Sequence, residues 1–166
     1  MVSTSVYYPP PCFSFAVSVG SDKAAAQSAA DASFQEVSGL DARIEVEPYQ
    51  EGGENRYMHQ LPKTTRFSNL VLKRGYVVSS SYLAEWTAGT VGSTFAAGIE
   101  TNTLVITLLG PDHQPLVVWN IDRAWPVRWE AGPLDAQKNE ILTETMEFSY
   151  ATMTRSLPAG GGASRS

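Results

Sequence analysis

One short polar segment, EGGENRYMHQLP, carries residue types that catalysis commonly uses. It spans residues 51–62 and combines Glu51, Glu54 and His59 with two adjacent glycines. Two carboxylates beside a histidine would suit acid–base chemistry if a rigid framework held them across a cleft. A glycine-rich turn fixes no such separation, so the sequence favours solvated turn acids. An enzyme that uses these three residues is an alternative that would still need a substrate pocket.

Other kinds of site find little support. Cys12 lies within an apolar alternating strand pattern, which is typical of a small buried residue rather than of a reactive thiolate. His59 and His113 lie on separate polar segments without the additional ligands that zinc requires. The GGEN sequence lacks the lysine–serine pair of a phosphate-binding loop. The sequence therefore predicts no catalytic residue, no metal site and no cofactor.

Composition points to one soluble domain that belongs to an assembly. The chain has 166 residues, a formal net charge of −5 and a pI near 5.0, so no overall field attracts nucleic acid or anionic lipid. Charged residues make up only 17%, which suggests that part of the surface is covered by subunits. The start of the chain has no secretory signal pattern, and no apolar run could span a membrane. We therefore expect the chain to fold in the reducing cytoplasm, and any later release from the cell would not use a signal peptide.

Period-2 alternation of apolar residues predicts a mainly β protein. One helix is expected over 79–89, where Tyr82, Leu83 and Trp86 form an apolar face and Gly89 closes the C-terminus. The fold class is two packed antiparallel sheets that form a sandwich or barrel, with one flanking helix and an extended hairpin loop. The predicted strands lie at 12–19, 34–49, 64–78, 103–110, 115–121, around Val127 and Trp129, and at 140–153.

The hairpin loop is expected between two of these strands, over residues 50–63. Charged residues occupy every second position of the strand before it, which indicates one side that faces solvent or another subunit. Gly52 and Gly53 allow a positive φ angle at its tip, and Asn55 tolerates one. The alternating residues are Ile44, Val46 and Pro48 on one side and Arg43, Glu45 and Glu47 on the other.

A basic cluster follows the hairpin and supports a second class of function. With nearby aromatic residues, it could form a sheet that binds single-stranded nucleic acid. Acidic residues precede it, however, and pairing of these acids with the cluster is the favoured interpretation. The cluster consists of Lys63, Arg66, Lys73 and Arg74, and the acids are Glu45, Glu47, Glu51 and Glu54.

The order of several motifs resembles a known family. FQEVSGLD, EGGEN, NLVLKRG, LVITLLG, PLVVWN, AWPVRW and NEILTETMEFSY occur in this order between Tyr8 and Tyr150. Together they resemble the tube proteins of contractile phage tails, and most closely the inner-tube proteins of phage tail-like contractile injection systems. The versions of EGGENRYMHQLP and ETMEFSY here resemble the tube-initiating type found next to the baseplate.

The resemblance implies a structural, non-enzymatic subunit. Six copies would close into a ring, and rings would stack into a hollow tube for protein cargo inside a sheath. The expected partners are further copies of this chain, other tube proteins, and sheath and baseplate subunits, with nucleic acid not expected. The resemblance also divides the chain into an N-terminal arm (1–11), a β-barrel domain (12–153) with an alanine-rich insertion (21–33), and a disordered tail (154–166).

Within this family, EGGENRYMHQLP is interpreted as the tip of an arm that reaches a neighbouring subunit or ring. Its glycines would permit the turn, and its polar side chains would make contacts across the joint. Two basic residues of the following strand are expected to join these contacts. The predicted contact residues are Glu51, Gly52, Gly53, Glu54, Asn55, Arg56, His59, Lys73 and Arg74.

Overall fold

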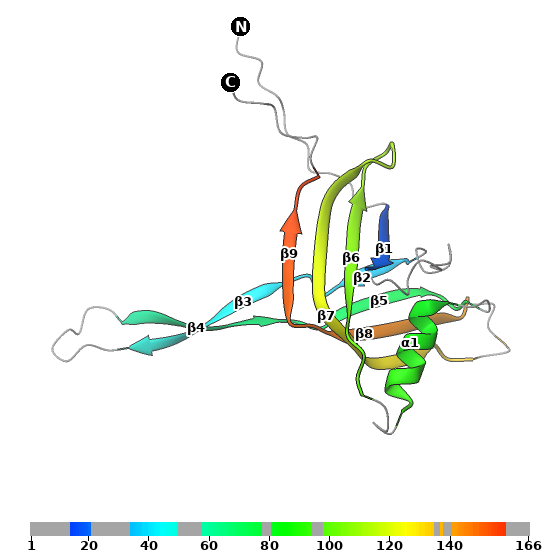
Figure 1. Ribbon diagram of the computed structural model, residues 1–166, viewed down its shortest axis with the longest axis horizontal. Helices are drawn as coiled ribbons and strands as arrows, with labels where there is room; N and C mark the ends of the chain where they lie inside the picture. The colour runs from blue at the N-terminus through cyan, green and yellow to red at the C-terminus, as the bar shows by residue number, and fades with distance from the viewer. Residues whose placement is uncertain are drawn as a thin grey trace, which may run out of the picture.

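The computed structural model describes residues 14–20, 34–49, 58–77, 81–93, 98–134, 137 and 141–158. Strands dominate these residues, together with one helix (Figure 1). The expected insertion and the tip of the hairpin lie outside the described residues. The elements are β1 (Phe15–Val19), β2 (Glu36–Ser38), β3 (Ala42–Tyr49), β4 (His59–Phe67), β5 (Leu70–Gly75), α1 (Tyr82–Val91), β6 (Asn102–Leu109), β7 (Pro115–Ala131), β8 (Thr143–Ser149) and β9 (Thr152–Ser156).

Two antiparallel layers share one strand. The first layer has the order β1-β6-β7-β9, and the second has the order β7-β8-β5-β2. Figure 1 shows the strands of the first layer crossing those of the second at a steep angle. The prediction of two packed sheets with one helix is therefore confirmed. Within the described residues the end strands β1 and β2 do not pair with each other, so the sheet does not close into a barrel.

Strand β7 connects the layers because it bends. The sequence patterns predicted two separate strands at 115–121 and around Val127, but the structure has one strand of 17 residues. Its first part pairs with β6 and β9, and its last part pairs with β8. Arg123 has a φ of 53° at the change of layer, and the pairing register shifts between Pro126 and Arg128. Proline lacks the amide donor of a regular ladder, which suits such an irregularity.

The last predicted strand divides into two. Instead of one strand over 140–153, β8 ends at Ser149 and β9 begins at Thr152. The chain leaves the second layer at this point and joins the first layer beside β7. Strand β9 continues to Ser156, beyond the domain end expected at residue 153. The alternation in the sequence was correct, but it contained no sign of this change of layer.

The core lies between the two layers and beneath α1. Trp86 of the helix packs against Phe148 of β8, with ring centroids 5.4 Å apart. The Ser81 side chain caps the helix by accepting a hydrogen bond from the Ala84 amide. The helix ends at Val91 and is followed by Gly92 as its C-cap, rather than closing at the expected Gly89. The buried apolar residues are Val17, Val19, Leu70, Leu72, Leu83, Trp86, Leu104, Ile106, Ile121, Ala124, Met146 and Phe148.

Candidate assembly interface

Strands β3 and β4 form an arm that stands away from both layers. They pair only with each other, in a separate two-stranded sheet. Figure 1 shows this arm projecting sideways from the body, so no other described element supports its length. The predicted hairpin is confirmed, but its strand begins at His59, so residues 59–63 belong to β4 rather than to a loop.

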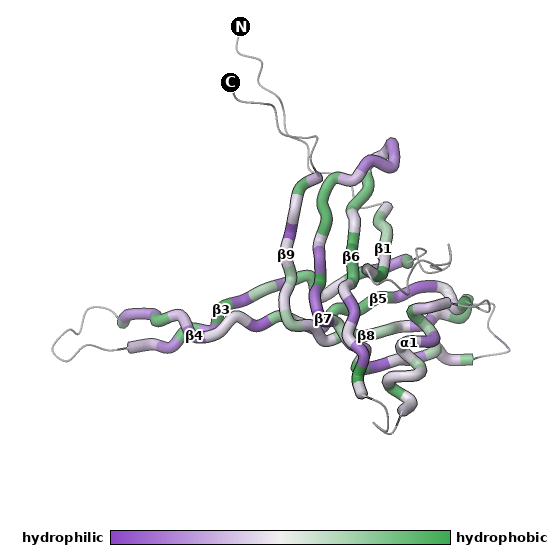
Figure 2. Tube along the Cα trace, viewed as in Figure 1, coloured by the Kyte–Doolittle hydropathy of each residue, from purple (hydrophilic) through white to green (hydrophobic). Residues whose placement is uncertain are grey.

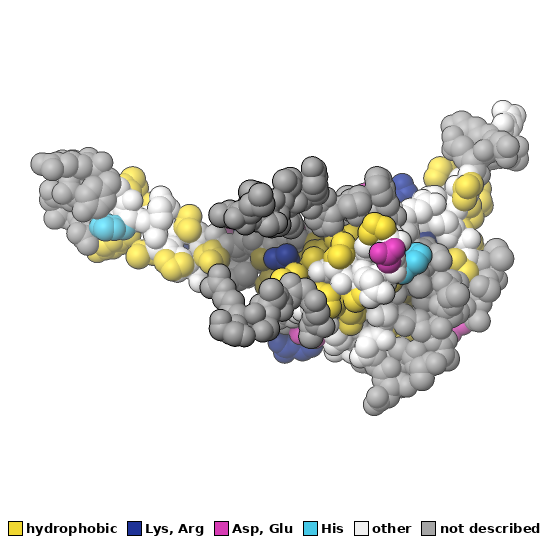
Figure 3. Space-filling view, turned by 90° about the horizontal axis from the view of Figure 1, so that it is seen from above, with side chains coloured by type: hydrophobic (Ala, Val, Ile, Leu, Met, Phe, Trp, Pro, Cys, Tyr) yellow, Lys and Arg dark blue, Asp and Glu magenta, His cyan; other side chains and the backbone are white. Residues whose placement is uncertain are grey.

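Several large apolar side chains on the arm are exposed to solvent. Ile44 is 59% exposed and Val46 is 56% exposed, although β-branched residues at alternate positions usually face a core. Figure 3 shows hydrophobic side chains along the arm out to the region of its histidine. Soluble proteins rarely leave a contiguous apolar surface of this kind without a partner. The remaining exposed apolar residues of the arm are Tyr49, Met58 and Leu61.

The two faces of the arm differ along its length. Ile44 and Val46 lie on one face, opposite Thr65 and Pro62 of β4. On the other face, the half nearest the body is charged. There Glu45 forms an ion pair with Arg66, and Glu47 pairs with Lys63 at 3.3 Å. Figure 2 shows hydrophilic and hydrophobic positions side by side along the arm.

Nearer the tip, the charged face also becomes apolar. Tyr49 pairs with His59 on this face, and the neighbouring Met58 is also exposed, so exposed apolar side chains occur at alternate positions on both faces of this half. Strands with apolar residues on both sides are typical of segments buried between two surfaces. The outer half of the arm therefore has the composition of a segment covered on both sides.

One cation on the arm lacks an ion-pair partner within the described residues. Arg43 lies directly opposite Arg66 across the two strands, and like charges in this position repel each other. Arg66 is neutralised by Glu45, whereas Arg43 forms no ion pair in the part of the chain that the structure describes. The base of the arm thus presents a positive charge that an external carboxylate could neutralise.

Comparison with known proteins identifies the family. The family described as "T4-like virus tail tube protein gp19" matches residues 11–154. The chain belongs to this tail tube protein family. A search of curated protein sequences found no match.

Solved structures similar to this tube protein include chains from a baseplate and from a sheath–tube complex. A chain in the "Cryo-EM structure of the anti-feeding prophage (AFP) baseplate, 6-fold symmetrised" has 28% identity and a TM-score of 0.78, and the match covers 93% of this chain and 99% of that one. A chain in the "PVC sheath-tube complex in extended state" of an extracellular contractile injection system has 25% identity and a TM-score of 0.75, with coverage of 95% and 99%. Hcp1 from Flavobacterium johnsoniae has 16% identity, a TM-score of 0.50 and coverage of 90% and 97%, which shows similarity of fold alone.

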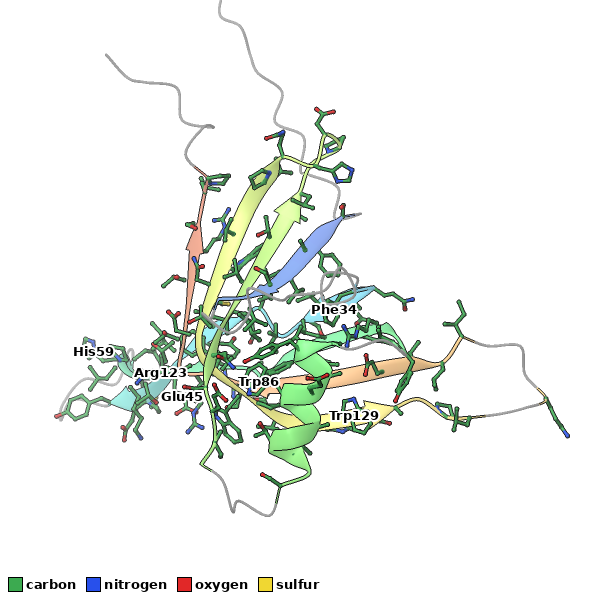
Figure 4. All side chains as sticks on the ribbon, turned by 45° about the vertical axis from the view of Figure 1, so that its right-hand side comes forward. Phe34, Glu45, His59, Trp86, Arg123 and Trp129 are labelled. Carbon is green, nitrogen blue, oxygen red and sulfur yellow. The ribbon has the colours of Figure 1, made fainter. Side chains whose placement is uncertain are left out.

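The structure of the tube protein separates the contact residues expected from the sequence. Residues 51–56 lie outside the described residues. His59 lies on β4 in the arm, where it pairs with Tyr49. Lys73 is half-buried on β5, between Glu36 of β2 and Thr145 of β8. Figure 4 shows Glu45 and His59 at the arm, away from Trp86 at the helix and Trp129 on the last part of β7.

Arg74 corrects one part of the prediction. Its side chain is completely buried and forms an ion pair with Glu144, so it is not available for contact with another subunit. The guanidinium also donates to the Ser81 hydroxyl at 2.8 Å and lies 5.2 Å from the centre of the Phe34 ring. Trp129 donates its indole N–H to the other carboxylate oxygen of Glu144. This network joins the helix N-terminus to the second layer.

The four residues of the basic cluster therefore form no continuous basic surface. Lys63 and Arg66 are paired with acids on the arm, as the sequence suggested, while Arg74 is inside the core. Within the described residues, no group of three or more His, Cys, Asp or Glu side chains is placed to hold a metal ion. No helix among these residues is long and apolar enough to cross a membrane.

Two features of the arm are not predicted by its sequence pattern. Charges at alternate positions of the first arm strand indicate one side that faces solvent or another subunit, and the structure leaves Ile44 and Val46 on the opposite side exposed as well. The contact residues predicted from the sequence are the polar ones near the tip and do not include the exposed apolar residues Ile44, Val46 and Leu61. The available signal was the alternation of Ile44, Val46 and Pro48, which does not distinguish a core from another subunit as the surface that covers them.

Proposed function

We propose that this tube protein is a subunit of the inner tube of a contractile injection system. In this proposal, six copies close into a ring, and the rings stack into a hollow tube through which protein cargo is delivered. The tube lies inside a sheath and begins on a baseplate, so sheath and baseplate proteins are partners. The assembled particle forms in the cytoplasm and acts after release.

The observation that carries the proposal is the uncovered apolar arm. A two-stranded hairpin is at best marginally stable in water without a surface to pack against. None of the described elements of this chain covers Ile44 and Val46, and a neighbouring copy would supply such a surface. An arm that projects from one side of a subunit makes a head-to-tail contact, and contacts of this kind generate rings or stacks.

The similar structures support the same arrangement. One comes from a baseplate with six-fold symmetry, and another comes from a complex of sheath and tube. In each case the match covers 99% of the similar chain, so the likeness extends over nearly the whole of that subunit.

Within the tube, we place this subunit in the ring that begins the tube on the baseplate. Its form of the EGGENRYMHQLP and ETMEFSY segments supports this placement. The identity to the chain from the AFP baseplate structure is 28%, against 25% for the chain from the sheath–tube complex. A gold or fluorescent label on this subunit in purified particles decides the point. Label at one end supports the placement, whereas label along the shaft contradicts it.

Ring formation is tested with the purified protein. The expected result is ring-shaped particles in negative-stain images and a mass of six subunits by light scattering as the concentration rises. A protein that stays monomeric when concentrated, and that is missing from purified particles, would falsify the proposal.

The role of the arm is tested by matched variants. Ile44→Asp with Val46→Asp places charge on its apolar face and should abolish rings or stacks while the monomer stays folded. Ile44→Leu with Val46→Ile keeps the face apolar and should retain assembly. Equal assembly by the two double variants would show that the arm is not buried between subunits.

A further inference from the structure

The direction of the arm is set at its root, where the chain enters β3 and leaves β4. Gly39 lies at the entrance with a φ of 85°, a conformation that side-chain-bearing residues rarely adopt. A Cβ atom at this position would overlap the backbone carbonyl of Asn69, which follows the exit from β4. The two ends of the arm therefore lie tightly against each other at its root.

Tyr150 touches both ends of the arm at once. Its hydroxyl donates a hydrogen bond of 3.2 Å to the carbonyl oxygen of Gly39. Its ring lies 5.4 Å from the ring of Phe67, the last residue of β4, with the planes tilted by 44°. One side chain of the body therefore contacts the entrance and the exit of the arm.

Tyr150 also stands where the two layers separate. It follows β8, and the next residue, Ala151, donates its amide to the carbonyl of Asp122 on β7 at 3.1 Å. On the other side, Asn69 donates to the Glu147 carboxylate of β8 at 2.7 Å. The chain next to Tyr150 is thus bonded to the first layer, and the exit of the arm is bonded to the second layer.

We propose that Tyr150 is a positioning residue that sets the direction of the arm relative to the two layers. Among the described strands, β3 and β4 pair only with each other, so no backbone ladder holds the arm at an angle to the body. The angle then depends on the few contacts at the root. The hydrogen bond from the Tyr150 hydroxyl to Gly39 restricts movement of the chain where it enters β3. The Tyr150 ring packs against Phe67, where the chain leaves β4.

This role rests on the proposed function and extends it, because the arm can pack against a neighbouring copy only when it points in the right direction. It differs from a purely structural role of Tyr150 in the core. A structural role would lower the stability of the whole domain when altered. A positioning role would change the range of arm directions while the domain keeps its stability.

The test uses spin labels on the arm and on the body of the full chain, in dilute monomer. Cysteine is introduced for Gln60 on β4 and for Gln114 in the turn between β6 and β7, with Cys12→Ser to remove the native thiol. Pulsed electron–electron distance measurements then give the distribution of arm positions. Tyr150→Phe removes the hydroxyl and keeps the ring, and Tyr82→Phe is the matched control on α1.

In Tyr150→Phe we expect the ratio of displaced to held arms to rise about fivefold, the factor given by the loss of one net hydrogen bond. The control should leave the distribution unchanged, and both variants should unfold close to the wild-type temperature. An unchanged distribution in Tyr150→Phe overturns the proposal, and so does a loss of stability without any change in arm position. If the wild type forms no rings, the proposed function fails, whereas the label distances still decide the role of Tyr150.

Discussion

Arg74 and Glu144 face each other across β5 and β8 and form an ion pair inside the core. Both side chains are almost completely buried. Such a pair contributes little net stability by itself, but breaking it leaves a charge without a partner in an apolar environment. The pair also opposes a slip of β8 by one residue, because that slip would turn Glu144 to the outer face.

Arg74→Met should therefore destabilise the protein by about 3–5 kcal/mol, because the Glu144 carboxylate would remain buried without its cation. The double variant Arg74→Met with Glu144→Leu should recover a large part of this loss. Urea unfolding, monitored by tryptophan fluorescence, measures the free energy of unfolding of both variants. If the double variant is no more stable than the single one, the unpaired charge is not the source of the loss.

Gly39→Ala should destabilise the root of the arm by roughly 1–3 kcal/mol, because the φ angle is positive and the new methyl group meets Asn69. Gly89→Ala is the control, since its Cβ would meet no atom within 4 Å and the position lies inside α1. It should stabilise the protein by about 0.5–1 kcal/mol through helix propensity. Relative to the wild type, the unfolding temperature should fall for Gly39→Ala and rise for Gly89→Ala.

Stability at alkaline pH should depend on Tyr150. Partial burial and the nearby Asp41 carboxylate raise the pKa of its phenol above the ordinary value of 10.0. The folded protein therefore holds this proton more tightly than the unfolded chain, and the stabilisation is complete below pH 10.0 and lost as pH rises through the raised pKa. Denaturant titrations above this pH should show a shallower decline for Tyr150→Phe than for the wild type. If the free energy of unfolding fell equally with pH in Tyr150→Phe and in the wild type, the raised pKa of Tyr150 would not be the cause of the decline.

Arg43→Glu should make the isolated arm slightly more stable, by about 0.2–1 kcal/mol, because it replaces a repulsive cross-strand pair with Arg66 by an attractive one. The same variant should weaken assembly if a carboxylate of a neighbouring copy neutralises Arg43. Sedimentation at rising concentration measures the second effect, and Arg43→Lys serves as the control that keeps the charge. Assembly that is equal in Arg43→Glu and Arg43→Lys would exclude a neighbouring carboxylate as the partner.

Several elements could be predicted because their information is local. Alternation placed Val17 and Val19 on the buried side of β1, and the spacing of Leu83 and Trp86 identified the buried face of the helix. Leu70, Leu72 and Arg74 occupy alternate positions of β5 and so lie on the same face of the strand, which indicates that the arginine points inward. Burial of an arginine requires a partner such as Glu144, and that partner is distant in sequence, so local alternation alone does not predict it.

The sequence by itself determined the β-rich class, the helix, the hairpin and, through the order of its motifs, the family. Only the tertiary structure decided that β7 spans both layers, that the last predicted strand divides at Tyr150, and that Arg74 is buried while Ile44 is exposed. The physical reason is that alternation reports which side of a strand is apolar. Which surface covers that side depends on pairing between distant segments and, for the arm, on another molecule.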